Sequence, residues 1–181
     1  DYSPTPRVNS FAIAFAENKP NLLVRLFEDS PFGAFSKNGG TTWQDFTSTP
    51  PGANGSQPPS SIAISANGSR LVWIPQNSVA YYSTNFGTNW TASSGGPFGS
   101  GNRVPIADRV NDSRFYINSG STFYVSTNGG ASFTSTAGVS SGTTPRSVFG
   151  LEGHVWLPRG TSGLSRSTNS GSTFTAVPGV Q

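Results

Sequence analysis

The stretch Ser36-Lys37-Asn38-Gly39-Gly40-Thr41-Thr42-Trp43 recurs three more times along this chain of 181 residues. The other copies are STNFGTNW at 83–90, STNGGASF at 126–133 and STNSGSTF at 167–174, so the first serines lie 47, 43 and 41 residues apart. A repeat with a period in this range predicts an array of similar supersecondary units. The rule is S-x-N-x-G-x-x-[W/F], and its fixed residues are Ser36, Asn38, Gly40, Trp43, Ser83, Asn85, Gly87, Trp90, Ser126, Asn128, Gly130, Phe133, Ser167, Asn169, Gly171 and Phe174.

The octapeptide has the composition of a tight turn, and we predict that its fixed residues are structural. The asparagine at its third position can accept hydrogen bonds from backbone N–H groups two residues further on. The glycine at its fifth position supplies a left-handed backbone. The aromatic residue at its eighth position is a large apolar anchor that packs under the turn. Each copy is therefore predicted to clamp a β-hairpin.

Short apolar or alternating runs, separated by Gly, Pro, Asn and Ser, predict an all-β fold. The second repeat shows the pattern, with runs at 61–65, 70–75, 79–83 and 89–92 and an Asn-Gly turn signal at 67–68. Four short antiparallel strands per repeat are typical of a β-propeller blade. We therefore predict a single β-propeller segment over 1–181, with blades at about 8–47, 60–92, 103–135 and 145–178.

Four blades of this size use up the chain. An array of blades must either close into a ring or have its end faces covered. Neither end of the sequence resembles a cap, which favours an arc of a larger ring over a small closed one. Such an arc requires further propeller segments, or a second copy of the chain, to cover its ends.

The composition excludes several classes of protein. Charged residues make up only 10%, and the 11 Lys and Arg are scattered singly, so no nucleic-acid surface is expected. No apolar run approaches the ~20 residues of a membrane span. The chain has no cysteine and one histidine, His154, so we expect no metal, no cofactor and no histidine-based triad. The low charge suits an extracellular, secreted protein, in which the sequons at Asn54, Asn67 and Asn111 would be candidates for N-glycosylation.

The octapeptide resembles the Asp-box, or BNR repeat, S-x-D-x-G-x-T-W, with asparagine in place of aspartate in all four copies. Three phrases narrow the resemblance: FAIAFAENKPNLLVR at 11–25, RLVWIP at 70–75, and GHVWLP at 153–158 followed by GLSRST at 163–168. Together they look like the C-terminal propeller of glycoside hydrolase family 74, the xyloglucanases. The resemblance implies an arc of a seven-bladed propeller, from an enzyme in which two propellers face each other across a cleft.

The resemblance also implies an activity, that of a secreted inverting endo-β-1,4-glucanase acting on xyloglucan or a related plant cell-wall β-glucan. Inversion needs two carboxyl groups about 6.5–9.5 Å apart, one to protonate the leaving oxygen and one to activate water. The family's acid segment, a Gly-Asp pair followed by Gly-Phe and His-Asp, is absent here and would fall upstream of Asp1. We therefore expect this chain to form one wall of the glycan cleft and to be inactive alone. Among its own carboxylates, Asp108 is the catalytic candidate to test first.

Candidate substrate-binding residues are Trp73, Tyr116, Trp156 and Arg159. The three aromatic residues fall at similar places on the second strand of their repeats, and aromatic rings can stack on the apolar faces of sugars. The same repeated placement also fits packing between blades. An alternative function is a carbohydrate-binding propeller, or lectin, that completes its ring by self-association. A sialidase-like or receptor propeller is the third possibility, and the scattered arginines do not favour it.

Overall fold

The computed structural model describes residues 12–53, 61–76, 78–96, 103–138 and 143–179, and these residues form four four-stranded antiparallel sheets. Within each sheet the strands pair in sequence order, so every strand lies next to the one before it. This confirms the all-β class and the division into propeller blades. The strands are β1 (Ala12–Ala16), β2 (Lys19–Leu26), β3 (Gly33–Ser36), β4 (Gln44–Asp45), β5 (Ser61–Ile64), β6 (Leu71–Ile74), β7 (Tyr81–Ser83), β8 (Thr91–Ala92), β9 (Ile106–Ala107), β10 (Phe115–Ser119), β11 (Thr122–Ser126), β12 (Thr134–Gly138), β13 (Arg146–Ser147), β14 (Val155–Pro158), β15 (Leu164–Ser167) and β16 (Thr175–Ala176), and the short 3-10 turn η1 (Gly160–Ser162) joins β14 to β15.

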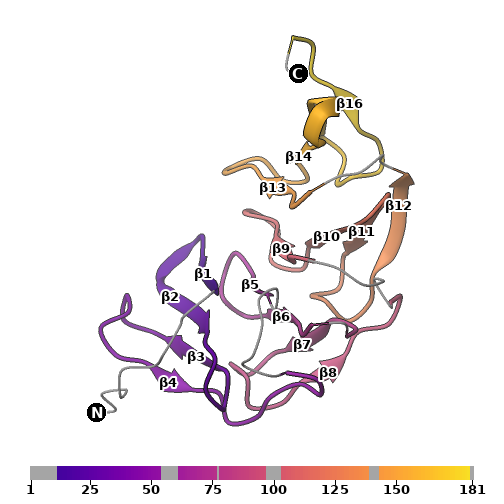
Figure 1. Cartoon of the computed structure of the whole chain (residues 1–181). Coiled ribbons are helices and arrows are strands. Elements are labelled where there is room, and N and C mark those ends of the chain that lie inside the picture. The colour runs from indigo at the N-terminus through magenta and orange to yellow at the C-terminus, as the bar shows by residue number, and fades with distance from the viewer. Residues whose placement is uncertain (1–11, 54–60, 77, 97–102, 139–142, 180–181) are drawn as a thin grey trace.

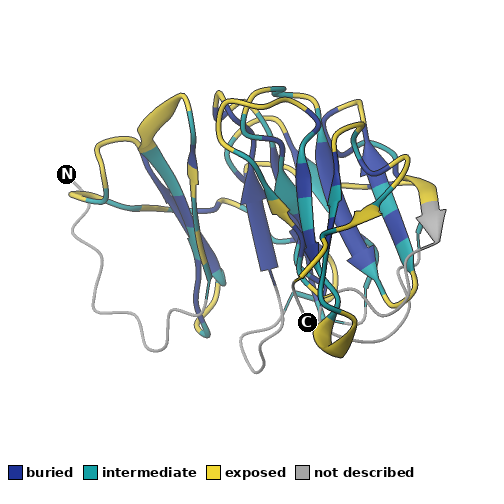
Figure 2. Cartoon of the chain, turned by 90° about the horizontal axis from the view of Figure 1, so that it is seen from above, coloured by how far each residue is buried: buried dark blue, intermediate teal, exposed yellow. Residues whose placement is uncertain are grey.

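The four sheets, numbered blades 1 to 4 in chain order, fan side by side along an arc (Figure 1). The first strands β1, β5, β9 and β13 lie along the concave side, and the last strands β4, β8, β12 and β16 lie along the convex side. Buried residues run along the strands, and exposed residues gather in the turns that join them (Figure 2). This is the arrangement of blades around the axis of a propeller.

Three apolar clusters hold neighbouring blades together. Val24, Leu26 and Phe35 of blade 1 belong to the same buried cluster as Leu71 and Trp73 of blade 2. The boundary between blades 2 and 3 and that between blades 3 and 4 are built in the same way, with Val72, Ile74, Phe115, Ile117 and Phe133 in one cluster and Tyr116, Phe123, Val125, Val155 and Leu157 in the other. The sheets of blades 2 and 3 therefore pack through both faces, one toward the blade before and one toward the blade after, which we call the backward and forward faces. The equivalent faces of blades 1 and 4 carry the same names.

The box octapeptide closes the turn between the third and fourth strands of every blade. The serine hydroxyl accepts the N–H of the box glycine, at 2.9 Å in blade 1 and 2.8 Å in blade 4, and donates to the asparagine Oδ1 at 3.0 Å in both blades. The same oxygen accepts the backbone N–H four residues further on, for example from Thr42 to Asn38 at 2.9 Å. The sequence predicted an acceptor, but the bond spans four residues and not two, because the N–H two residues after the asparagine, that of the box glycine, donates to the serine hydroxyl instead.

The glycine of the box is required for two reasons. All four box glycines have a positive φ, between 75° and 89°, as predicted. In addition, a Cβ on Gly87, Gly130 or Gly171 would overlap a side chain of the preceding blade, which is Phe46, Val72 or Phe123 respectively. The nearest atom to a Cβ on Gly40, in contrast, would be the Trp43 ring of its own blade at 3.7 Å. The box therefore shapes the backward face of its blade as well as its own turn.

The aromatic residue of the box follows the same rule. Trp90, Phe133 and Phe174 pack into the three clusters between their own blade and the preceding one. Trp90 meets Trp73 edge to face, with ring centroids 5.3 Å apart. Trp43 of blade 1 is half-buried and lies 4.3 Å from the guanidinium of Arg25. The predicted anchor thus packs between blades, and only partly under its own turn.

We expect Gly171→Ala to destabilise the chain more than Gly40→Ala. Both substitutions place a Cβ on a left-handed backbone, which costs about 1–2 kcal/mol. Only Gly171→Ala also drives that Cβ into the Phe123 ring, and overpacking of this kind adds about 1–3 kcal/mol. Urea unfolding of the two purified variants measures the difference, and equal losses of stability would contradict the role of the glycine between blades.

Candidate functional site

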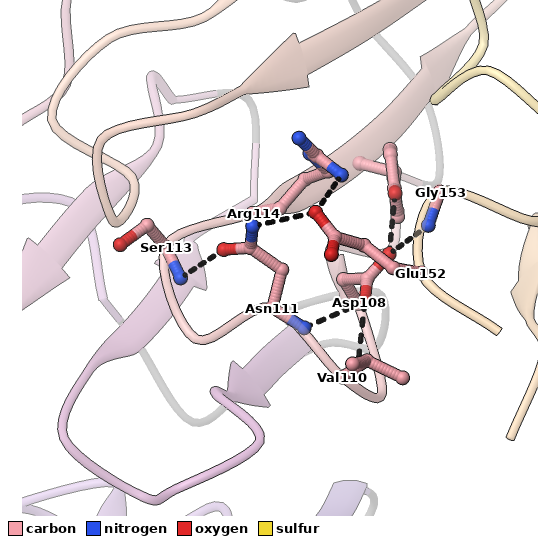
Figure 3. Close-up of polar contacts among 8 residues, drawn as sticks. Asp108, Val110, Asn111, Ser113, Arg114, Glu152 and Gly153 are labelled. Atoms are coloured by element: carbon pink, nitrogen blue, oxygen red, sulfur yellow. Dashed lines mark hydrogen bonds and ion pairs between the residues drawn. The ribbon is translucent and has the colours of Figure 1, made fainter. Parts of the chain in front are cut away.

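Asp108, the catalytic candidate, lies directly after β9 and is 1% exposed. One carboxylate oxygen accepts the backbone N–H groups of Val110 and Asn111 at 2.9 and 2.8 Å. The other accepts the hydroxyl of Tyr116 at 2.6 Å and the N–H of Gly153 at 2.8 Å. Figure 3 shows this carboxylate at the centre of the polar contacts.

Four donors therefore fix the Asp108 carboxylate, and its lone pairs point into the protein. A general acid or base needs one oxygen within reach of substrate or water, and an inverting glycosidase needs a second carboxyl group across a gap. Asp108 instead holds the turn after β9 and joins blade 3 to blade 4 through Gly153. The structure thus gives Asp108 a structural position.

The hydrogen bond to Asp108 also affects Tyr116, which is fully buried in β10. Burial, and then the hydrogen bond to Asp108 and its charge, raise the pKa of the Tyr116 phenol well above the ordinary value. The phenol therefore stays protonated and remains a donor to the carboxylate. Both members of the pair serve the core at the boundary with blade 4.

The turns between the first and second strands form a hydrogen-bonded chain at one end of the blades. Asn18 donates to Ala66 O at 2.8 Å, which joins blades 1 and 2. Asp112 accepts the N–H of Asn67 at 2.7 Å and the hydroxyl of Ser69, which joins blades 2 and 3. Blades 3 and 4 are joined at this end by hydrogen bonds from the side chains of Asn111 and Arg114 to Glu152, both at 2.8 Å.

One further ion pair in this region skips a blade. Glu17 in the turn after β1 receives Arg109 from the turn after β9, with Nε and Oε2 2.6 Å apart. Four carboxylates at this end, those of Glu17, Asp108, Asp112 and Glu152, thus tie turns of different blades together. The sequence carried no signal for the partners of these carboxylates.

The aromatic binding candidates do not share one environment. Trp73 is 1% exposed in the cluster between blades 1 and 2, and Tyr116 is fully buried between blades 3 and 4. Neither ring offers a face to a sugar in this structure. Trp156 is half-buried, and the guanidinium of Arg166 lies 5.2 Å from its ring centroid.

The expected equivalence of these aromatic positions is wrong by one residue. The box serine Ser83 pairs with Leu71, and the box serine Ser167 pairs with Val155. Trp73 therefore lies two residues after its aligned partner, whereas Trp156 lies one residue after. Because successive side chains in a strand point to opposite faces, Trp73 faces backward and Trp156 faces forward.

Arg159, the fourth binding candidate, follows β14 at the end of the blade opposite to the chain of turns. It is half-buried, and its Nη1 donates to the hydroxyl of Ser165 at 3.2 Å. The structure thus separates Arg159 from Trp73 and Tyr116, which lie in the core. Two arginines that the sequence analysis did not single out, Arg146 and Arg166, lie beside Trp156 on neighbouring strands.

A cavity of about 660 Å³ lies along the first strands on the concave side of the arc. Its walls are mainly apolar and include Ile13, Phe15, Ile62 and Ile106. Among the carboxylates that line it, Glu17 is paired with Arg109 and Asp108 is buried. The cavity therefore has the character of a propeller axis enclosed by blades, and not of a pair of opposed catalytic acids.

The predicted glycosylation sites lie in different settings. Asn67 is exposed, and its Oδ1 accepts a hydrogen bond from Asn18 at 3.0 Å. Asn111 uses its Nδ2, the atom that a glycan would occupy, to bond Glu152. Asn54 lies outside the described residues. Within the described ranges, no three His, Asp or Glu side chains gather to hold a metal ion. No described helix has the length and apolar content to cross a bilayer.

The fold and this arrangement of turns can be compared with known proteins. No family model matches the chain. A xyloglucanase from Paenibacillus sp. is 34% identical over 186 residues, which cover 94% of this chain and 18% of that protein. The oligoxyloglucan-reducing end-specific xyloglucanase of Emericella nidulans is 28% identical, and the match covers 94% of this chain and 25% of that protein.

Solved structures give the same result. The glycoside hydrolase family 74 enzyme of Niastella koreensis superimposes with a TM-score of 0.82 at 35% identity, over 96% of this chain and 25% of that one. The family 74 xyloglucanase of Xanthomonas campestris has a TM-score of 0.82 at 26% identity. The protein is thus an Asp-box β-propeller segment. More particularly, it is similar to part of a propeller of the family 74 xyloglucanases, and it spans 18–26% of the length of these four proteins.

We expect Asp108→Asn to lower the free energy of unfolding by about 2–3 kcal/mol, because the new NH₂ group would face the Gly153 N–H, and a buried donor without an acceptor costs this much. Asp29→Asn is the control, since Asp29 is exposed and its substitution is expected to change stability by less than about 0.5 kcal/mol. Urea unfolding of both variants measures the effect. A fully stable Asp108→Asn chain would contradict the structural assignment.

Tyr116 predicts a pH dependence at the alkaline end. Its pKa is raised in the folded state, so its contribution to stability is fully present below the unfolded value of about 10 and is lost as the pH rises beyond that value. We expect the stability of the chain to fall above about pH 10, and to fall less steeply in Tyr116→Phe. Unfolding curves of both proteins from pH 8 to 11, at about half-unit steps, test this; parallel profiles would rule it out.

Proposed function

We propose that this chain is part of one propeller of a secreted, inverting endo-β-1,4-glucanase that hydrolyses xyloglucan, and that it forms one wall of the glycan-binding cleft. The observation that supports this most is the 34% identity to a xyloglucanase over 94% of the chain. The match runs through all four blades and therefore involves more than the shared box. The short share of the relatives that it covers supports a segment of a larger enzyme.

We infer that the catalytic acids belong to other parts of that enzyme. The carboxylates of Glu17, Asp108, Asp112 and Glu152 already accept hydrogen bonds or form ion pairs with residues of other blades. Their geometry serves to position blades, whereas an inverting reaction needs two carboxyl groups on opposite sides of the scissile bond. On its own, the chain is therefore expected to leave xyloglucan intact.

The end of the blades that carries Arg159 is the part of this chain that we assign to the glycan. The opposite end is occupied by the hydrogen-bonded turns, which leaves few of their polar groups for a ligand. Arg159 lies at this end, where its Nη1 donates to the hydroxyl of Ser165, and a guanidinium carries several N–H donors of the kind that bind sugar hydroxyls. The remaining propeller segments of the enzyme would cover the end faces of the arc.

Affinity electrophoresis and an activity assay test this function together. The purified 181-residue chain should release no reducing ends from xyloglucan, yet xyloglucan in the gel should retard it. Arg159→Ala should reduce the retardation several-fold. Arg70→Ala, an arginine at the opposite end of its blade, is the matched control and should leave it unchanged. Turnover by the chain, or mobility that is indifferent to xyloglucan, would overturn the proposal.

The mass of the natural protein tests the segment and its secretion separately. We expect the culture medium of the source organism to contain a polypeptide several times heavier than the 18.9 kDa of this chain. Peptide mapping with antibodies or mass spectrometry would locate the 181 residues within it. A secreted protein of 18.9 kDa would show that the chain acts without further segments.

A further inference from the structure

The forward face of blade 4 differs from the three forward faces that pack inside the arc. In every blade, three cross-strand neighbours form a row on this face. The rows of blades 1 to 4 are Ala14–Val24–Phe35, Ala63–Val72–Tyr82, Ile106–Tyr116–Val125 and Arg146–Trp156–Arg166. The first three rows belong to the apolar clusters between blades. The fourth row has a tryptophan between two arginines and belongs to none of these clusters.

This composition is that of an interface between separate surfaces. Tryptophan and arginine are enriched where independent proteins bind each other, because they combine a large contact area with directional polar groups. Arg166 lies over the Trp156 ring at 5.2 Å, so its planar group adds to the apolar surface of the indole. Arg146 is exposed, and both other members of the row are half-buried. In the described part of the chain, no other sheet packs on this row.

The backward face of blade 1 is also left without a neighbouring sheet among the described residues. Gly40 and Trp43 hold the positions that receive a preceding blade in the other three boxes, yet a Cβ on Gly40 would meet only Trp43 within 4 Å. Beside them on the same face, Ile13 and Phe15 are 67% and 50% exposed. These two side chains alternate along β1 with Ala12, Ala14 and Ala16, which pack against blade 2. The backward face of blade 1 thus has the features that receive a preceding blade in blades 2 to 4, and among the described residues no sheet packs on it.

We propose that, when the chain is alone, the forward face of blade 4 packs on the backward face of blade 1 of a second copy. Packing of a forward face on a backward face already occurs three times within the arc, so the contact continues an established interface. Because the two faces are different, each copy gives one and receives one, and the proposal is that two copies close into a ring of eight blades, the upper end of the usual propeller range. The proposal goes beyond the xyloglucan function, since the same faces would take neighbouring blades in a longer enzyme.

Sedimentation equilibrium of the full 181-residue chain is the test. We expect a dimer, weakened at least tenfold by Ile13→Asp, which places a charge on the backward face, and equally by Arg146→Glu, which reverses one on the forward face. Both residues are exposed, so neither change should unfold the chain, and circular dichroism checks this. Val110→Asp is the control, because Val110 is 38% exposed on a turn of blade 3, away from both faces.

Mixing the two weakened variants distinguishes this contact, in which two different faces meet, from a contact between identical faces of the two copies. Ile13→Asp keeps an intact forward face and Arg146→Glu keeps an intact backward face, so a mixture retains one good contact and should associate more strongly than either alone. A monomeric wild-type chain would overturn the proposal. So would a dimer that is sensitive to one face only, or growth beyond two copies with concentration. These readouts do not involve glycan, so they are independent of the xyloglucan test.

Discussion

The hydrogen bond from the box glycine N–H to the box serine hydroxyl is the constraint on which this arc depends. It draws the turn tight enough that the glycine lies against the preceding blade, where Gly87, Gly130 and Gly171 leave room for one side chain each. A single local clasp therefore sets two things at once, the hairpin between the third and fourth strands and the spacing to the preceding sheet. Asparagine serves here where relatives of the motif use aspartate, because the acceptor oxygen is what the clasp requires.

The box aromatic residues and the turn carboxylates add to the packing between blades that the clasp begins. The box aromatic fills the space that the glycine opens, so that Trp90, Phe133 and Phe174 anchor one blade in the cluster shared with another. The carboxylates complete the assembly at the far end of the first two strands, where Asp108 and its neighbours bond adjacent turns. An inverting glycosidase needs carboxylates that are free to exchange protons, whereas the carboxylates at this end already bond other turns.

The sequence predicted the sheets because the clasp is local: all its fixed residues lie within eight positions, and the period counts the blades. The sequence predicted less well on which face of its sheet each side chain lies. Trp73 and Trp156 occupy similar places in their repeats, yet a difference of one position relative to Ser83 and Ser167 reverses the face. The bonds between turns could not be predicted either, since Glu17 and Arg109 are 92 residues apart and neither belongs to a motif.

The Glu17–Arg109 pair has a geometric consequence. The other links between turns described above join adjacent blades, and each of them fixes only the position of one blade relative to the next. The bond between Glu17 in blade 1 and Arg109 in blade 3 spans blade 2, so it limits how far the arc of blades can open or close. The Glu17–Arg109 pair therefore restrains the curvature of the arc at the turn end, away from the clasps themselves.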